Sequence, residues 1–181
     1  MSRRRSISVS KMRFAVLAGP LAILAVASGC KAAALPESAA CAGVPHMALK
    51  GRVTDTADIL SAEEEAQLSE RLARYEQRTS HQMVVATVPA LNDVRVDNFG
   101  TCLGNRWGIG RKDQDDGIVI LVAPNDRQMH IATGSGMEKT LTDDKALAVI
   151  HQMTPHFKGG DYAVGFSTGI DAIAVQTGDT P

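Results

Sequence analysis

The chain has 181 residues, with 19 Lys and Arg against 20 Asp and Glu, and only 4% of its residues are aromatic. Five of the basic residues lie in the first 13 positions, so the ~150 residues that follow position 29, the size of one domain, carry 14 basic against 20 acidic side chains. An acidic domain is a poor candidate for nucleic-acid binding and suits a cation or a partner with basic patches.

Residues 1–29 have the three parts of a bacterial export signal. A basic region is followed by an apolar run from Phe14 to Val26, and Ala27-Ser28-Gly29 then precedes Cys30. The apolar run is shorter than the roughly 20 residues that a membrane-spanning helix needs. We therefore predict a lipoprotein signal peptide over residues 1–29, with diacylglycerol attached to the Cys30 thiol before the bond preceding Cys30 is cut.

A lipid anchor at Cys30 would hold the exported chain on the periplasmic side of the cell envelope, because two or three acyl chains give stable membrane attachment. Lys31 follows the anchor and favours the outer membrane over the inner one. Residues 30–50 are rich in Ala, Pro and Gly and lack a hydrophobic period, which predicts the anchor and a flexible tether. The open alternatives are an ordinary secretory signal with a coincidental cysteine, and a translation start at Met12 in place of Met1.

Two cysteines remain beyond the lipid site, Cys41 and Cys102. In an oxidising compartment we expect such a pair to form a disulfide bond. A bond that closes a loop of this length contributes roughly 4 kcal/mol by the loop-closure entropy argument. Two free or buried thiols are the alternative.

One domain is predicted over residues 51–178. Residues 53–60 indicate a turn-rich approach to a helix that begins with the capping box Ser61-Ala62-Glu63-Glu64 and runs to about Arg78. The elements predicted after it are a buried strand over 83–88, a helix over 97–107, a hairpin of strands over 118–123 and 128–133, and helices over 143–153 and 162–175. This alternation predicts a mixed sheet with helices on both sides.

Several short motifs follow one another along this domain. They are Ile59-Leu60-Ser61, Trp107-Gly108-Ile109-Gly110, Asp116-Gly117 before the run Ile118 to Val122, Ile131-Ala132-Thr133-Gly134-Ser135-Gly136-Met137-Glu138, and Pro155-His156-Phe157-Lys158-Gly159-Gly160-Asp161-Tyr162. In this order and spacing they resemble the TPM domain, or thylakoid phosphatase-like family, over about Val53 to Thr177. The resemblance implies an α/β fold, a three-layer α/β/α sandwich with a small mixed central sheet and Rossmann-like topology.

The resemblance also suggests where chemistry could lie. It points to Asp55, Asp58, Asp115 and Asp116 as metal ligands, in two acidic loops that could lie near each other. Calcium takes six to eight oxygen ligands, mainly carboxylates and carbonyls, so Ca²⁺ is the expected ion. The alternative is that these aspartates are solvated loop residues and that Asp58 caps a turn.

We therefore predict a membrane-tethered TPM-domain lipoprotein that binds a divalent cation and serves as an accessory or interaction module for an envelope protein partner. Plant members of the family have been assigned acid phosphatase activity, so a phosphomonoesterase is the alternative. Such an enzyme needs a nucleophile or a metal-bound water, and a group to hold phosphate. Arg106, Arg111 and Lys112 could hold the phosphate, but the sequence has neither a P-loop lysine pattern nor a nucleophile elbow.

Overall fold

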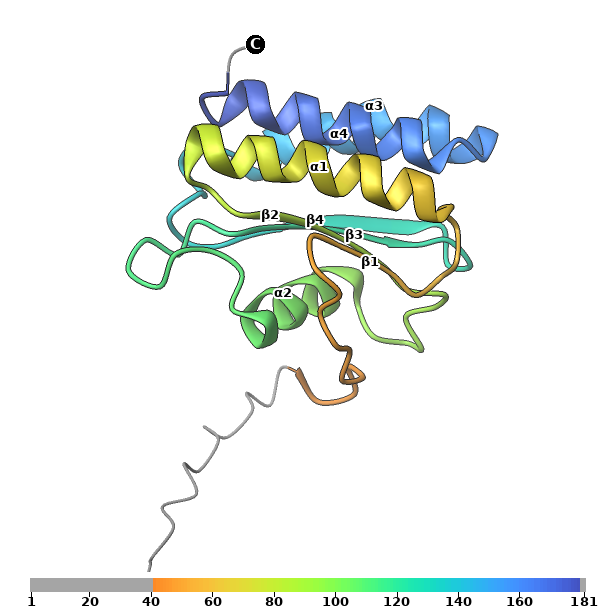
Figure 1. The fold of residues 1–181 in the computed structure, drawn as a ribbon. Coiled ribbons are helices and arrows are strands. Elements are labelled where there is room, and N and C mark those ends of the chain that lie inside the picture. The colour runs from red at the N-terminus through yellow and green to blue at the C-terminus, as the bar shows by residue number, and fades with distance from the viewer. Residues whose placement is uncertain (1–40, 180–181) are drawn as a thin grey trace, which may run out of the picture. The chain divides into compact units, whose positions relative to one another are not determined.

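The structure, a computed structural model, describes residues 41–179, in which a four-stranded sheet lies between two layers of helices (Figure 1). The predicted signal peptide over residues 1–29 and the lipid site at Cys30 lie outside the described residues. The elements are β1 (Val53–Asp55), α1 (Ala62–Thr79), β2 (Met83–Thr87), α2 (Val96–Trp107), β3 (Ile118–Ala123), β4 (Gln128–Thr133), α3 (Asp143–Gly159) and α4 (Tyr162–Gln176). The predicted α/β/α sandwich is confirmed.

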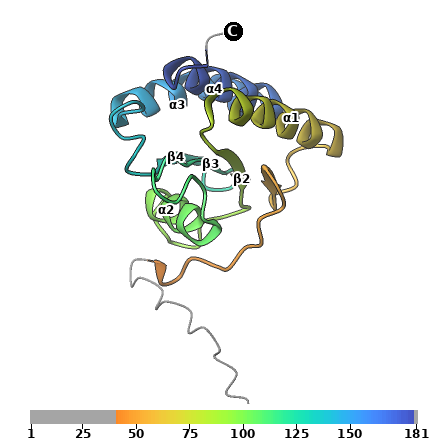
Figure 2. The same ribbon diagram turned by 60° about the vertical axis from the view of Figure 1, so that its left-hand side comes forward.

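The strands lie in the sheet in chain order, with β1, β2 and β3 parallel and β4 antiparallel to β3. Helix α1 connects β1 to β2 and covers one face together with α3 and α4, whereas α2 connects β2 to β3 and covers the other (Figures 1 and 2). The crossover from β1 to β2 and the crossover from β2 to β3 move in the same direction across the sheet. Because their helices lie on opposite faces, the two crossovers have opposite hand. One of the two is therefore left-handed, which is rare between parallel strands.

Successive strand side chains enter two separate hydrophobic cores. Val85, Ile120 and Ile131 pack with the α1, α3 and α4 layer, whereas their neighbours Val119 and Ala132 pack with α2. All six residues of β3 are buried. A strand covered on both faces needs apolar side chains at every position, which explains the unbroken apolar run in the sequence.

Helix α1 begins as the capping box predicts. The backbone N–H of Ser61 donates to Oε2 of Glu64 over 2.7 Å, and the backbone N–H of Glu64 donates to Oγ of Ser61 over 3.3 Å. Its buried face consists of Leu68, Leu72 and Tyr75. These residues are spaced by four and three positions, so they lie on one side of the helix.

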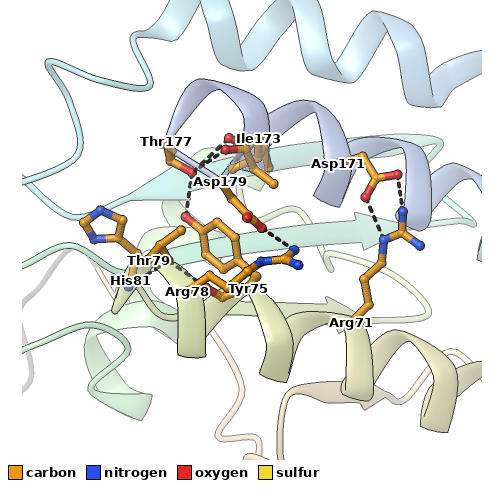
Figure 3. A network of polar contacts seen from close by, with 10 residues as sticks. Arg71, Tyr75, Arg78, Thr79, His81, Asp171, Ile173, Thr177 and Asp179 are labelled. Carbon is orange, nitrogen blue, oxygen red and sulfur yellow. Dashed lines mark hydrogen bonds and ion pairs between the residues drawn. The ribbon is translucent and has the colours of Figure 1, made fainter. Parts of the chain in front are cut away.

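Polar contacts join α1 to α4 and to the last described residues (Figure 3). They are the Arg71–Asp171 ion pair, a 2.7 Å hydrogen bond between the hydroxyls of Tyr75 and Thr177, and a 2.6 Å ion pair between Arg78 and Asp179. The Asp179 side chain is only 4% exposed, whereas its partner Arg78 is 56% exposed. Helix α4 is thus paired with α1 through Asp171, and the segment after α4 is held against the last turns of α1.

The short strand β1 was not expected from the sequence. Only Val53–Asp55 pair with β2, and Val53 is level with Val85 in the register. Three residues are too few to show an alternating pattern, so we had expected only a turn-rich approach to α1. The strand exists because β2 offers it a parallel partner.

Helix α3 continues beyond the predicted end at Met153, through Pro155 to Gly159. Proline removes one backbone hydrogen bond and crowds the preceding turn. The added turn carries Phe157, whose ring centroid lies 5.1 Å from that of Phe166. This packing holds the helix together past the proline.

An N-terminal arm, residues 41–47, packs against α2 instead of forming part of a flexible tether. The predicted disulfide is confirmed, since Cys41 is bonded to Cys102 with their Cα atoms 5.6 Å apart. The guanidinium of Arg106 donates to three carbonyl oxygens of the arm over 2.9 to 3.2 Å, and the indole N–H of Trp107 donates to a fourth over 2.8 Å.

No helix within residues 41–179 is long and apolar enough to cross a membrane.

Candidate functional site

The four aspartates proposed as metal ligands lie at two opposite ends of the sheet. Asp55 ends β1 and Asp58 follows it, whereas Asp115 and Asp116 come directly before β3. In the sheet register, Asp55 is level through β2 with Val122, near the far end of β3. A distance of roughly 20 Å along the strands therefore separates the two pairs. The expectation that the two acidic loops lie near each other is wrong.

Asp55 holds the loop between β1 and α1. Its Oδ2 accepts hydrogen bonds from the backbone N–H groups of Ile59 and Leu60, both over 2.9 Å, and its Oδ1 accepts one from the Thr87 hydroxyl. Both oxygens are therefore used to join β1, β2 and the start of α1. Asp58 is exposed, has a φ of 55°, and its side chain makes no hydrogen bond to residues 41–179.

Asp116 is a buried carboxylate, 2% exposed, in the loop before β3. Its Oδ1 accepts from the backbone N–H of Arg111 over 2.8 Å, and its Oδ2 accepts from Nε of Arg111 over 2.7 Å and lies 2.8 Å from Nδ1 of His81. Burial raises the pKa of this carboxyl group, but the hydrogen bonds from Arg111 and His81 outweigh it and hold the pKa well below its ordinary value. Asp116 thus fastens its loop to the segment between α1 and β2.

The arginines expected to hold a phosphate have structural partners instead. Arg111 is bound to Asp116, and Arg106 is bound to the carbonyl oxygens of the N-terminal arm. Lys112 is exposed, and its side chain has no polar partner within residues 41–179. The structure does not bring the three together around one site.

Asp115 and Glu138 line a pocket of about 230 Å³ on the α2 face of the sheet. Asp115 Oδ2 accepts a hydrogen bond from the backbone N–H of Ser135 over 2.8 Å. The other Asp115 oxygen and both Glu138 oxygens have no hydrogen-bond partner among the described residues. The remaining oxygen-bearing side chains that line the pocket are those of Thr101, Asn105, Thr133 and Ser135.

The glycines after β4 bring the Asp115 loop to this place. A Cβ on Gly134 would lie 2.1 Å from the carbonyl oxygen of Asp115, and a Cβ on Gly136 would lie 1.8 Å from that of Gln114. Only glycine allows so close an approach between two backbones. Gly134 and Gly136, in the motif that follows β4, therefore bring the Asp115 loop to the pocket that Glu138 also lines, and Glu138 was not among the predicted site residues.

The pocket can be compared with the needs of a calcium ion. Calcium accepts carboxylate, amide, carbonyl and water oxygens, and extracellular modules with few charged ligands bind it at about 10⁻⁴ to 10⁻³ M. The pocket lining supplies two carboxylates, one amide and several hydroxyls, which are ligand types that calcium accepts. Within residues 41–179 there is no group of three or more His, Cys, Asp and Glu residues that could hold a metal ion. Neutral oxygens and water would therefore complete the coordination.

Three solved structures resemble this chain. The first is the N-terminal domain of a protein from P. gingivalis, with 30% identity, a TM-score of 0.62, and coverage of 68% of this chain and 80% of that one. The BA42 protein from Bizionia argentinensis has 20% identity, a TM-score of 0.59, and coverage of 68% and 84%. The N-terminal domain of cg2496 from Corynebacterium glutamicum has 13% identity, a TM-score of 0.58, and coverage of 76% and 86%.

The last two similarities establish the fold alone, because their identities are low. No curated protein matches the chain significantly. The sequence profile of the TPM domain matches residues 53–176, which is most of the chain and includes every strand and α-helix described within residues 41–179. This chain therefore belongs to the TPM domain family.

Proposed function

We propose that this protein is an exported accessory module, tethered to the cell envelope by lipid at Cys30, that binds a divalent cation between Asp115 and Glu138. The observation that carries the proposal is the pocket itself, in which two carboxylates with free oxygens meet amide and hydroxyl oxygens. Oxygen-only donor sets of this kind select hard cations such as Ca²⁺. The acidic balance of the chain beyond its first 13 residues favours cation entry.

The helical layer supports the second part of the proposal, an envelope protein partner. Leu147 on α3 and Val164 and Val175 on α4 are each at least half exposed. Exposed apolar side chains on a helical layer are available for contact with the apolar surface of a partner. Binding to a partner through this layer would leave the Asp115 pocket, on the α2 face, open to solvent.

Calcium titration with thermal melting of residues 31–181 tests the cation site. At about 10 mM Ca²⁺, a hundred times the tighter expected dissociation constant, we expect about 2.7 kcal/mol of added stability, a rise of several degrees in Tm that EDTA reverses. Asp115→Asn and Glu138→Gln should each remove most of the rise. Asparagine tolerates the left-handed backbone at Asp115, where φ is 45°, so this variant is expected to fold.

Asp58→Asn is the matched control, because Asp58 is exposed at the other end of the sheet and also has a positive φ. It should leave the calcium response unchanged. Loss of the response in Asp58→Asn alone would move the site to that end, and the absence of any response to Ca²⁺ or Mg²⁺ would rule out the cation function.

The phosphatase alternative is tested with the same preparations. Hydrolysis of a phosphate monoester at acidic pH, abolished by Asp115→Asn, would replace the accessory role by an enzymatic one. A calcium response without turnover supports the module proposed above.

A further inference from the structure

A larger pocket, of about 470 Å³, opens at the end of the sheet opposite Asp115. It lies where β3 ends, between the turn that leads into β4, the last turn of α3 and the first residue of α4. Its wall contains Met129, Phe157 and Tyr162, and its polar groups include Arg127, Lys158 and Thr154. The volume and the mainly apolar wall with a few polar groups are typical of small-molecule sites.

Arg127 differs from every other arginine in residues 41–179. Each of the others donates a hydrogen bond to a carboxylate or to a backbone carbonyl group. The Arg127 guanidinium makes no hydrogen bond or ion pair within these residues, and the same is true of the Lys158 ammonium group. Two cationic side chains therefore line one pocket without a carboxylate partner, although acidic residues outnumber basic ones in this domain.

The backbone at Arg127 favours glycine over any residue that carries a Cβ. Its φ is 53°, and its N–H donates to the Pro124 carbonyl oxygen over 3.1 Å, which closes the turn between β3 and β4. In hairpin turns this left-handed position favours glycine, and another residue there costs about 1 kcal/mol. Glycine would therefore relieve the backbone and remove a side chain that makes no polar contact with the rest of the domain.

The other side of the pocket is already ordered. The Phe157 ring lies 5.4 Å from the Tyr162 ring and 5.1 Å from the Phe166 ring, so it is held on two sides. The Thr154 hydroxyl donates to the Ile150 carbonyl oxygen over 2.7 Å, which leaves its lone pairs able to accept a hydrogen bond from a ligand. An apolar wall that is fixed before binding lowers the entropy cost of holding a flat ligand.

We propose that this pocket binds a small organic anion, with its carboxylate or phosphate group held by Arg127 and Lys158 and its apolar body against Phe157. A guanidinium group can pair with a carboxylate or with a phosphate through two parallel hydrogen bonds. Arg127 could therefore hold a ligand that carries either group. The site is separate from the Asp115 pocket and does not depend on a bound cation.

Calorimetric titration of the full-length protein in a non-ionic detergent tests this proposal with four probes: phenyl phosphate, benzoate, inorganic phosphate and benzyl alcohol. We expect phenyl phosphate, benzoate or both to bind at least about tenfold more tightly than the last two probes, which lack either the apolar body or the charge. A preference for phenyl phosphate identifies a phosphate head group, and a preference for benzoate a carboxylate.

Arg127→Gly and Lys158→Gln should each weaken binding by about tenfold or more, as expected for the loss of a charge-assisted contact. Lys139→Gln removes an exposed charge outside the pocket and should change nothing. Arg127→Gly should also unfold at a higher urea concentration than the wild type, which separates lost binding from lost structure. The proposal is overturned if no organic anion binds, if Arg127→Gly binds as tightly as the wild type, or if that variant is less stable.

Discussion

The hydroxyl of Tyr75 on α1 lies 2.7 Å from the hydroxyl of Thr177 beyond the end of α4. The Thr177 oxygen also lies 2.9 Å from the carbonyl oxygen of Ile173, which can only accept. Thr177 therefore donates its proton to Ile173, and Tyr75 donates to Thr177. Burial raises the pKa of Tyr75, so the phenol keeps the proton that this bond requires.

Tyr75→Phe is expected to lower the free energy of unfolding by about 1 kcal/mol, the usual net value of one buried hydrogen bond. The measurement is urea denaturation at neutral pH. Tyr162→Phe is the matched control, since the Tyr162 hydroxyl has no hydrogen-bond partner within residues 41–179, and it should change the free energy by a few tenths at most. Equal losses in the two variants would mean that the Tyr75–Thr177 bond adds nothing.

Asp116 should make the stability of the domain depend on pH in the acidic range. Its folded-state pKa is depressed, so its contribution is present above the unfolded pKa of about 3.9 and is lost as the pH falls from that value toward the folded-state pKa. We expect the free energy of unfolding to fall most steeply below about pH 4. Denaturant midpoints measured between pH 2 and pH 7 check this expectation.

Asp116→Asn should lower the free energy of unfolding by about 2–3 kcal/mol at neutral pH, because it weakens the contacts with Arg111 and His81. The free energy of unfolding of this variant should also depend less on pH in the acidic range than that of the wild type. The exposed Asp113 supplies the control, since Asp113→Asn should reproduce the wild-type profile. If the free energy of unfolding of Asp116→Asn falls as steeply at low pH as that of the wild type, other carboxyl groups cause the acid dependence.

Gly165 should not tolerate even one added methyl group. A Cβ there would lie 2.2 Å from Cε1 of Phe157, so Gly165→Ala is expected to destabilise the fold by about 1–3 kcal/mol. At Gly159 the nearest atom would be 3.4 Å away, on the Asp161 side chain, so Gly159→Ala in the last turn of α3 should be neutral or stabilising. Thermal melting of the two variants compares them, and a tolerated Gly165→Ala would show that Phe157 can move aside.

The disulfide between Cys41 and Cys102 should be the largest single local contribution to stability. The bond joins residues 61 apart in sequence, so replacing both cysteines by serine is expected to cost up to roughly 4 kcal/mol. A reducing agent should lower the Tm of the wild type and leave that of the double variant unchanged. A wild type that melts at the same temperature with and without reductant would contradict this expectation.

Elements whose signals are local could be predicted from the sequence. The start of α1 depends on Ser61 and Glu64, which lie three residues apart, and β3 depends on an apolar run from Ile118 to Ala123. Strand β1 depends on a partner that comes after α1 in the chain, so its three residues carry no signal of their own. The end of α3 depends on the space that Gly165 leaves for Phe157, which is a tertiary property.

The candidate sites could be predicted only in part. Asp115 was selected for its acidic loop, but Glu138 joins it only because two glycine-containing turns touch. Asp55 lies far away because the end of one parallel strand and the start of another occupy opposite edges of the sheet. Arg127 lies between the two strands of the predicted hairpin, and only its backbone angle and the absence of polar partners within residues 41–179 distinguish it. The lipid anchor at Cys30 stays a prediction.

The bond between Cys41 and Cys102 also decides how the domain responds to mechanical force. Tension that reaches Cys41 from the N-terminal side passes directly through the disulfide into α2. Strand β1, helix α1 and strand β2 all lie within the closed covalent loop and carry none of that load. The three-residue strand at the edge of the sheet, which would otherwise be the first element to be pulled away, is therefore shielded from tension applied on the N-terminal side of Cys41.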